Sequence, residues 1–385
     1  MKWKSVRLSD IADFSNGVNF DKSSYAKGVK LIGVSNFGNR FYPDYDKLDE
    51  IKADVVREND YLNDGDIVFV RSNGNKELVG RCMLVTNAPT KVTYSGFCIR
   101  CRVKDTLRVY PKFLTYYFKS SLFRCSVSGS AIGANIQNLS QGRMASHVLL
   151  LPDLPTQHRI ASILSAYDDL IENNRRQIKL LEEAAQRLYR EWFVELRFPG
   201  YENVKIVDGM PEGWKEGFIG DIAQFQRGKT IRKTDITAGS IPVVAGGLEP
   251  AYYHNKANTV GPVITVSGSG ANAGYTKLYN ENIFASDCSF VDSTSTPHLF
   301  FLFCCLRDRK AEIDSLQKGA AQPHVYAKDI NALRAIIPTQ SILCLFMKIA
   351  TPLFIKRENV EMQIRICIEA RDRLLPKLMS GGMEV

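Results

Sequence analysis

The sequence predicts an α+β protein made of two similar halves, each ending in a long helix, and two observations carry this prediction. The first is a repeated opening: "WKSVRLSDIADFSNG", which begins at Trp3, returns as "WKEGFIGDIAQFQRG" from Trp214 with seven residues in register. The second is a repeated helical pattern, in which "ENNRRQIKLLEEAAQRL" (172–188) aligns without a gap with "ENVEMQIRICIEARDRL" (358–374). A repeat this long indicates a duplicated domain rather than a solenoid.

Two further echoes lie between these, in the same order in each half. "VFVRSNGNKELVG" (68–80) pairs with "ITVSGSGANAG" (264–274), and "GSAIGANI" (129–136) pairs with "GAAQPHV" (319–325). The first pair reads as a short apolar strand followed by a polar loop with glycine. Because such short β-type runs alternate with amphipathic stretches, these blocks are expected to be α+β.

The stretch from Thr156 to Phe198 contains no glycine and no proline and predicts a helix. Apolar residues recur there at spacings of three and four over about five heptads, which is typical of a coiled-coil seam. In the C-terminal copy, Pro352 is expected to begin or kink the helix, and Pro376 with the following "SGG" to end it. The expected seam residues are Ile160, Leu164, Tyr167, Ile171, Asn174, Ile178, Leu181, Ala185, Leu188 and Trp192, and then Phe346, Ile349, Leu353, Val360, Ile364, Cys367, Leu374 and Leu378. Asn174 is polar and either fixes the register of the helices or lies at a frayed edge.

These patterns divide the chain into four segments. Globular domains are expected at 1–153 and 199–338, and spacer helices at 154–198 and 339–385. Antiparallel packing of the two helices would relate the two globular domains by a pseudo-twofold axis.

Composition is that of a globular protein, with 385 residues, 45% hydrophobic and 24% charged. The opening "MKWKSVRLSD" has no apolar signal core, and "HLFFLFCCL" (298–306) is too short to span a bilayer. The nine cysteines are an odd, scattered set, so we expect reduced thiols and a cytoplasmic location.

The net charge of +9 is unevenly placed. Residues 67–152 hold 12 Lys or Arg and only two acidic side chains, Glu77 and Asp105, which gives a local charge of +10. Such a surplus is typical of a face that binds a polyanion, although a solvated basic surface would look the same.

Motifs for catalysis are largely missing from the sequence. It contains no Pro-Pro, which a methyltransferase acting on adenine needs in its clamp for the flipped base. "QRGKT" (226–230) lacks the first glycine of a phosphate-binding loop, because that position is Ala223. Cys98 and Cys101 have Cys-x-x-Cys spacing, but in a strand they face opposite ways and could not easily share a zinc ion. The acids near Pro43 and Glu50 resemble a metal-nuclease set only loosely, and a solvated loop explains them better.

The order of these motifs, twice over, resembles the specificity subunit of type I restriction–modification systems. The resemblance spans essentially the whole chain and includes "GDIVFVRSNG", "NLSQGRMASHVLLLPDLPTQHRIASIL" and the ending "EARDRLLPKLMSGG". It implies two target recognition domains, each reading one half of a split, asymmetric DNA sequence, with the helices setting the distance between half-sites. It also implies a chain without catalysis or cofactors of its own. Two methyltransferase subunits that use S-adenosylmethionine would methylate adenine, and restriction subunits that use ATP and Mg would cleave.

Base reading needs donors and acceptors on rigid loops, and phosphate contacts need Lys or Arg. Polar and basic residues on the loops after the paired strands, with nearby basic loops, therefore predict the DNA-binding set. Its members are Arg71, Ser72, Asn73, Asn75, Lys76, Arg81, Arg227, Lys229, Arg232, Lys233, Ser267, Ser269, Asn272, Tyr275, Lys277, Gln322 and His324.

Two alternatives remain at this level, a stand-alone methyltransferase or nuclease and a scaffold that no longer binds DNA. Six apolar residues are expected off the helix seam, where they pack either on partner helices or on the adjacent domains. They are Ile163, Leu170, Trp192, Phe193, Ile355 and Ile366.

Overall fold

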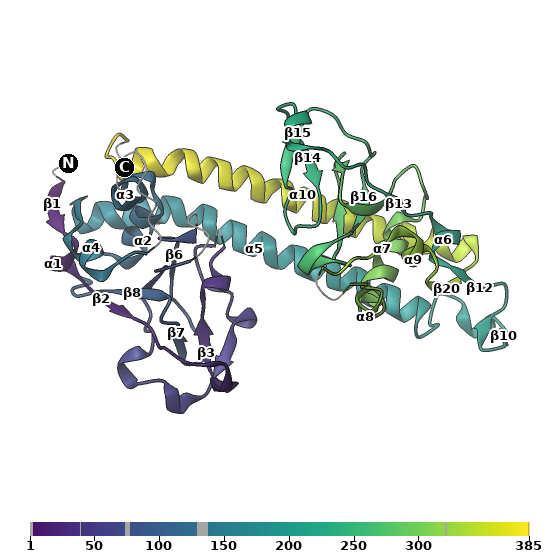
Figure 1. Ribbon diagram of the computed structural model, residues 1–385, viewed down its shortest axis with the longest axis horizontal. Coiled ribbons are helices and arrows are strands. Elements are labelled where there is room, and N and C mark those ends of the chain that lie inside the picture. The colour runs from purple at the N-terminus through teal and green to yellow at the C-terminus, as the bar shows by residue number, and fades with distance from the viewer. Residues whose placement is uncertain (1–2, 39, 74–77, 129–137, 320–321, 384) are drawn as a thin grey trace. The chain divides into compact units, whose positions relative to one another are not determined.

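The computed structural model of the chain describes residues 3–38, 40–73, 78–128, 138–319, 322–383 and 385. The chain forms two compact units (Figure 1). The first unit comprises residues 1–173 and 364–385, and the second comprises residues 174–363. Each unit therefore contains a globular part and a portion of both long helices, α5 (Leu154–Phe193) and α10 (Gln340–Met379).

Besides their parts of α5 and α10, the described residues of the first unit form three sheets and four short α-helices. Its four-stranded antiparallel sheet has the order β2 (Ala12–Asn16), β8 (Cys98–Val103), β5 (Ile67–Val70), β6 (Cys82–Leu84). A three-stranded sheet has the order β4 (Asp49–Ile51), β3 (Tyr25–Ile32), β7 (Val92–Tyr94), and a ribbon pairs β1 (Lys4–Arg7) with β9 (Val148–Leu151). The helices are α1 (Leu8–Ile11), α2 (Pro111–Lys119), α3 (Ser121–Ser128) and α4 (Gln141–Ser146).

The second unit repeats this arrangement. Its four-stranded antiparallel sheet has the order β13 (Gln226–Arg227), β19 (Cys288–Asp292), β16 (Val263–Ser267), β17 (Thr276–Tyr279). The three-stranded sheet is β15 (Tyr252–His254), β14 (Ile241–Val244), β18 (Phe284–Ala285), and the ribbon pairs β12 (Lys215–Phe218) with β20 (Arg334–Ile337). The helices are α6 (Ile219–Ile222), α7 (Leu299–Asp308), α8 (Lys310–Ser315) and α9 (Ala327–Asn331), and a small ribbon joins β10 (Ile206–Val207) to β11 (Met210–Pro211).

The repetition extends to strand direction and register. In both three-stranded sheets the central strand is antiparallel to one neighbour and parallel to the other. In both ribbons the first strand residue pairs with the last residue of the returning strand, Lys4 with Leu151 and Lys215 with Ile337. The repeated sequence thus folds into a repeated topology.

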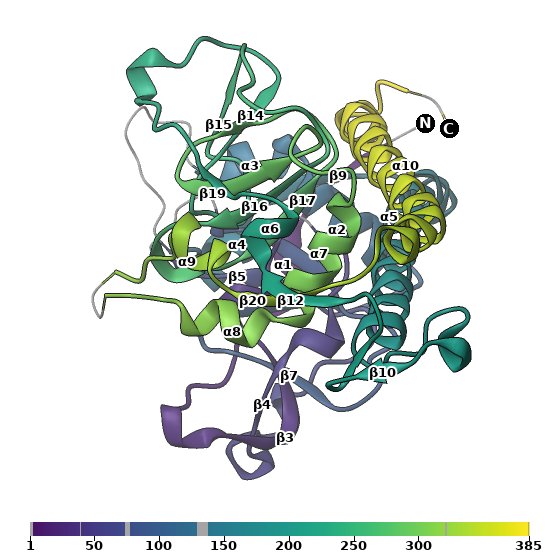
Figure 2. The same cartoon turned by 90° about the vertical axis from the view of Figure 1, so that its right-hand side faces the viewer.

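An apolar core in each unit joins the globular part to the long helices. In the first unit, aromatic residues of α2 and β5 such as Phe69 and Phe113 belong to one buried cluster with Ile160 and Leu164 of α5. Helix α2 lies between this sheet and α5 (Figure 1). In the second unit, α7 contributes the corresponding apolar residues, and α6, α7 and α9 lie around the sheet that contains β16 (Figure 2).

The cysteines of the Cys-x-x-Cys pair lie on opposite faces of β8. Cys101 belongs to the core cluster that contains α2, whereas Cys98 belongs to a separate cluster between the two larger sheets. Burial raises the pKa of the Cys98 thiol to about 12, so this thiol stays protonated at neutral pH.

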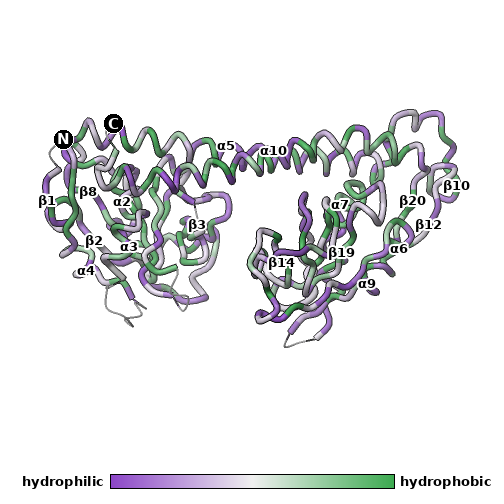
Figure 3. The backbone as a smooth tube through the Cα atoms, turned by 90° about the horizontal axis from the view of Figure 1, so that it is seen from above, coloured by the Kyte–Doolittle hydropathy of each residue, from purple (hydrophilic) through white to green (hydrophobic). Residues whose placement is uncertain are grey.

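The long helices pair along the predicted seam. Hydrophobic and hydrophilic residues alternate around both of them (Figure 3). The side chains of Asp168 and Arg371 meet in the first unit, and those of Glu182 and Arg357 in the second, so partner numbers fall along α10 as they rise along α5. The helices are therefore antiparallel.

Asn174 lies within this seam. Its side chain is buried, and its amide Nδ2 donates to Gln363 Oε1 at 3.4 Å. The interpretation that places this residue in the seam, rather than at a frayed edge, is the one that the structure supports.

Three expectations for the helices are corrected in whole or in part. Helix α10 already begins at Gln340, so Pro352 does not begin it, and the helix continues past Pro376. It ends at Met379, directly before the "SGG" that was expected to help end it, where Gly381 adopts a φ of 70° and turns the chain. Ile349 is 43% exposed, and Ala350 is buried in its place. Helix α5 ends at Phe193, ahead of the expected 198, because the chain leaves helical geometry at Leu196, whose φ is 59°.

The six apolar residues expected off the seam divide into two groups. Trp192 and Phe193 are buried in the core of the second unit, so they pack on the adjacent domain. The other four are 37% to 58% exposed, namely Ile163, Leu170, Ile355 and Ile366. Among the described residues, no helix is both long and apolar enough to cross a membrane.

Candidate nucleic-acid interface

At the end of β5 in the first unit, main-chain hydrogen bonds join three segments. The N–H of Arg71 donates to the carbonyl of Phe97 (2.8 Å), and the carbonyl of Arg71 accepts from the N–H of Leu139 (2.7 Å). One residue later, Ser72 pairs with Asn138 in an isolated β-bridge. Each of these contacts uses main-chain atoms, so the backbone of the loop is fixed without help from its side chains.

A fourth segment joins at the end of β2, where the N–H of Gly17 donates to the carbonyl of Cys98 (3.3 Å). The four segments bring a set of side chains to one end of the sheet. We call these residues the first strand-end cluster: Asn16, Arg71, Ser72, Phe97 and Asn138.

The end of β16 in the second unit has the same contacts. The N–H of Gly268 donates to the carbonyl of Asp287 (3.2 Å), and its carbonyl accepts from the N–H of Val325 (3.1 Å). Ser269 then pairs with His324 in an isolated bridge. The backbone frame at β5 therefore exists again at β16.

The fourth segment is repeated as well, because the N–H of Gly228 donates to the carbonyl of Cys288 (2.8 Å). The main-chain contacts alone therefore show which residue of the second unit corresponds to which residue of the first. The second strand-end cluster consists of Arg227, Gly268, Ser269, Asp287 and His324, which correspond in that order to the members of the first.

The two matched glycines allow the backbone segments to approach closely. A Cβ atom on Gly17 would lie 2.1 Å from the carbonyl oxygen of Tyr94, and one on Gly228 would lie 2.2 Å from that of Ser286. No side chain fits at such distances, so these positions need glycine for reasons of space. Both belong to the repeated opening motif of the sequence.

The side chains of the first cluster combine a cation with an exposed ring. One guanidinium nitrogen of Arg71, Nη1, donates to the carbonyl of Gly96 at 3.2 Å, which holds the side chain against the turn. The ring of Phe97, the next residue in that turn, is 63% exposed. A planar donor group and an apolar surface therefore lie side by side.

Beside its cation, Arg227, the second cluster carries a hydroxyl and a carboxylate. The Ser269 hydroxyl donates to the carboxylate of Asp287. Next to it, the hydroxyl of Ser267 and the amide of Asn272 both donate to the carbonyl of Gly246, at 3.0 Å and 3.4 Å. This cluster therefore presents hydrogen-bonding groups of both kinds on a loop that internal contacts hold in place.

Comparison with known proteins identifies the family. The model of the type I restriction modification DNA specificity domain matches residues 1–183 and 211–348. The chain belongs to this family.

Relatives and a solved structure agree with this assignment. The chain is 27% identical over 305 residues to the type I restriction enzyme MjaIX specificity subunit of Methanocaldococcus jannaschii, covering 72% of this chain and 70% of that protein. It is 21% identical to the HindI specificity subunit of Haemophilus influenzae, covering 98% and 99%. The crystal structure of the type I restriction-modification S subunit from M. genitalium has the same fold, with a TM-score of 0.57 at 16% identity, covering 98% and 96%.

Within this specificity subunit, the structure brings part of the predicted DNA-binding set together. Arg71 and Ser72 lie in the first strand-end cluster, and Arg227, Ser269 and His324 lie in the second. Their neighbours along the chain or in space are Asn73, Lys229, Ser267, Asn272, Tyr275 and Gln322, among which Tyr275 is 39% exposed. Asn75 and Lys76 lie outside the described residues.

Four predicted residues lie elsewhere or are held in other contacts. The ammonium group of Lys277 donates to the carbonyl of Leu248 at 2.9 Å, which restricts its reach. Lys233 lies over the ring of Tyr252, 5.9 Å from its centre, and Arg232 precedes it. These two residues belong to the segment beside β15 rather than to the strand-end cluster.

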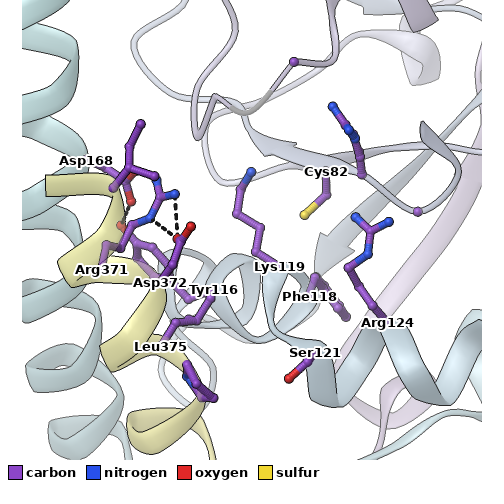
Figure 4. Close-up of a pocket in the computed structure, with 15 residues that line it drawn as sticks. Cys82, Tyr116, Phe118, Lys119, Ser121, Arg124, Asp168, Arg371, Asp372 and Leu375 are labelled. Carbon is purple, nitrogen blue, oxygen red and sulfur yellow. Dashed lines mark hydrogen bonds and ion pairs between the residues drawn. The ribbon is translucent and has the colours of Figure 1, made fainter. Parts of the chain in front are cut away.

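The fourth of them, Arg81, lines a cavity of about 560 Å³ in the first unit (Figure 4). Arg124 and Lys119 line the same cavity, and the Lys119 ammonium donates to the carbonyl of Arg40 at 2.8 Å. Burial lowers the pKa of Lys119. The far wall is the ion pair between Arg371 and Asp168.

Sequence reasoning missed five members of the clusters. These are Asn16, Phe97, Asn138, Gly268 and Asp287. Asn16 and Arg227 directly precede the matched glycines of the opening motif, so that alignment offered a signal. Phe97 and Asp287 directly precede the cysteines that begin β8 and β19. None of the repeated sequence motifs includes these two strands, so the sequence does not show that the two residues correspond.

Proposed function

We propose that this chain recognises a split, asymmetric DNA sequence, reading one half-site with each strand-end cluster. The observation that carries the proposal is the repeated backbone frame with unlike side chains. Since the frame is the same, the two units would approach DNA in the same way. Since the guanidinium of Arg71 and the ring of Phe97 in the first cluster are matched by Gly268 and the carboxylate of Asp287 in the second, the bases that they select would differ.

Phosphate contacts would supply most of the affinity that does not depend on sequence. The surplus of basic residues in 67–152 supports this role for the first unit. In the second unit, Arg227 of the strand-end cluster and Lys229 beside it are exposed, and they are the cations best placed for phosphate contacts. Contacts of this kind position the protein, and the clusters would add the sequence preference.

The reactions would belong to partner subunits. We infer that the chain assembles with two methyltransferase subunits, which use S-adenosylmethionine, and with restriction subunits, which use ATP and Mg. The apolar residues exposed on the two long helices are candidates for contacts with these partners, because burial of apolar side chains contributes to protein interfaces. They include Leu180 (63% exposed), Ile366 (58%) and Ile355 (50%).

Sequencing methylated bases in cells with and without this chain, with its methyltransferase present in both, tests the proposed function. The expected result is a split motif with two unlike halves that is methylated only when the chain is present. Methylation that persists without the chain would contradict the proposal.

A second measurement tests where the catalysis lies. The purified chain is expected to transfer no methyl group from S-adenosylmethionine to DNA, and to support transfer when the methyltransferase is added. Leu180→Asp would then weaken co-purification with the methyltransferase, because a carboxylate would replace an apolar contact. Transfer by the chain alone would favour the stand-alone enzyme.

A further inference from the structure

We propose that Phe97 and Asp287 are corresponding base-contacting residues, and that they give the two half-sites different base preferences. This inference rests on the proposed function. Phe97 would favour thymine, whose methyl group makes apolar contacts in the major groove, and Asp287 would favour cytosine, whose N4 amino group donates to a carboxylate.

Main-chain contacts establish that the two residues correspond. Phe97 immediately precedes Cys98, and Asp287 immediately precedes Cys288, and these cysteines pair with the last residues of β5 and β16. The carbonyl of each residue accepts a hydrogen bond from the first N–H after that strand, that of Arg71 or Gly268. The same backbone position therefore carries a phenyl ring in one unit and a carboxylate in the other.

Exposure indicates that Phe97 is not there for the core. Its ring is 63% exposed, while Cys98 and Ile99 beside it are fully buried. An exposed phenyl ring at a turn gains little from folding, because most of its apolar surface stays in water. The neighbouring Arg71 supplies the charge that would attract DNA to this surface.

Asp287 packs against Gly268, the residue that is matched to Arg71 of the first unit. A Cβ atom on Gly268, the residue matched to Arg71, would lie 3.2 Å from the carbonyl oxygen of Asp287 and 3.3 Å from its Oδ1. The carboxylate is therefore packed against the backbone at the position that carries the arginine in the other unit. The arginine and phenylalanine of one cluster are replaced together by a glycine and an aspartate in the other.

The hydroxyl of Ser269 orients this carboxylate. It donates to Oδ2 of Asp287. An ionised carboxylate only accepts hydrogen bonds, so it would pair with a base amino group and repel the acceptor atoms of guanine and of thymine. Beside the phosphates of DNA a carboxylate also lowers affinity in general, so its presence here calls for a selective role.

The test is selection of bound duplexes from a random library by the full-length chain, for the unaltered protein and for Phe97→Ala and Asp287→Asn. Phe97→Ala should reduce the thymine preference at one position of the first half-site. Asp287→Asn should reduce the cytosine preference at one position of the second half-site about tenfold and raise adenine there, because asparagine pairs with adenine. The other half-site should be unchanged in each case.

Matched controls separate base reading from charge and stability. Leu107→Ala removes an apolar side chain that is 84% exposed in the first unit, and Asp208→Asn removes one negative charge from an exposed turn in the second. Neither should change any base preference. Ser269→Ala should weaken the cytosine preference in the same position as Asp287→Asn, because it removes the group that orients the carboxylate.

The outcomes are distinguishable. If Asp287→Asn strengthens binding to all duplexes alike and leaves every preference intact, the assignment of Asp287 is overturned. The same holds for Phe97 if Phe97→Ala changes affinity alone. If the unaltered chain enriches no sequence at all while binding DNA, the proposed function fails first.

Discussion

The two units share strand order, strand direction and the main-chain contacts at the strand ends, yet their loop side chains differ at every matched position except Ser72 and Ser269. In the first cluster the residue after the strand is Arg71, and in the second it is Gly268. The comparison teaches that the backbone frame and the recognition surface are set by different groups. Main-chain atoms and close glycine contacts fix the frame, and the side chains that vary are those that project from it.

The largest expected difference between the units concerns the ion pairs that join the long helices. The side chain of Asp168 is 4% exposed and contacts Arg371 (2.5 Å) and the hydroxyl of Tyr116 (2.6 Å). Asp168→Ala would leave Arg371 largely buried beside the exposed Asp372, and it should lower the free energy of unfolding by about 3 kcal/mol in urea titrations. Glu182→Ala is the comparison in the second unit, where the carboxylate is 25% exposed and its buried partner Arg357 also pairs with Glu361 at 2.8 Å. A loss of about 1 kcal/mol is expected there, because the carboxylate that is removed is partly hydrated and Arg357 keeps one partner. Equal losses would remove this distinction between the units.

Substitution of the matched glycines tests whether the frame is equally strict in both units. Gly17→Ala and Gly228→Ala would each place a Cβ about 2 Å from a carbonyl oxygen. Each should cost about 2 kcal/mol of unfolding free energy, because the backbone must shift to make room. Gly142→Ala is the control, since nothing lies within 4 Å of the added atom. If only one unit were sensitive, the two frames would not be equivalent.

Arg71→Ala tests whether the arginine of the first unit contributes to its preference for a DNA sequence. It should weaken binding to the preferred sequence by about 1–3 kcal/mol and binding to random duplex by less. Because Gly268 stands at the matched position, the change should affect only the first half-site. Equal weakening on both kinds of duplex, measured by titration, would make Arg71 a phosphate contact instead.

Salt dependence should reveal the cations of the second unit. Arg227→Gln and Lys229→Gln should each reduce the slope of log K against log salt concentration by about 0.9, if each side chain neutralises one phosphate. Lys229→Gln, which alters no member of the cluster, should leave the preferences within the second half-site the same. Glu202→Gln, far along the chain in the same unit and exposed, is a control that should leave the slope nearly unchanged.

The smallest expected effect is a pH dependence confined to the first unit. Burial lowers the pKa of His147, whose Nε2 lies 2.8 Å from the Tyr117 hydroxyl. In the unfolded chain the imidazole takes up a proton below its ordinary pKa of 6.5, and in the folded protein it does so only at lower pH. The free energy of unfolding should therefore be highest above pH 6.5 and should fall as the pH decreases below that value.

His147→Gln should flatten that part of the pH profile in urea unfolding experiments. The matched residue of the second unit is Leu333, since both carbonyls accept the same type of bond, from Leu8 and Ile219. An unchanged profile in the His147 variant would assign the pH dependence to other groups.

Repetition and helical periodicity predicted much of the fold. The opening motif placed Gly17 and Gly228 in register, and the structure gives them the same contact. The heptads predicted the seam around Leu164, Ile171 and Val360, because burial on one helix face leaves a periodic mark. Helix ends were predicted less well. Pro376 lies inside α10, where packing of neighbouring residues such as Leu375 and Leu378 offsets the hydrogen bond that proline cannot make.

Sequence reasoning predicted the candidate site only in part. Polar loops with Arg, Ser and Asn predicted Arg71 and Ser269 as DNA-binding residues, and these two lie in the first and second strand-end clusters. Phe97 and Asp287 escaped because they reach the site through pairing between strands far apart in the chain, which no local pattern encodes. Lys277 was selected for its charge, although its ammonium group is already bound to the carbonyl of Leu248.

The matched contacts at the ends of the two sheets join peptide groups and two glycines, and this has a consequence for how such a protein can evolve. A main-chain hydrogen bond does not depend on the side chain of the residue that makes it. Side chains at the strand ends can therefore be substituted while the main-chain contacts that hold the loops persist. New target sequences would then arise by single codon changes in either half, independently of the other.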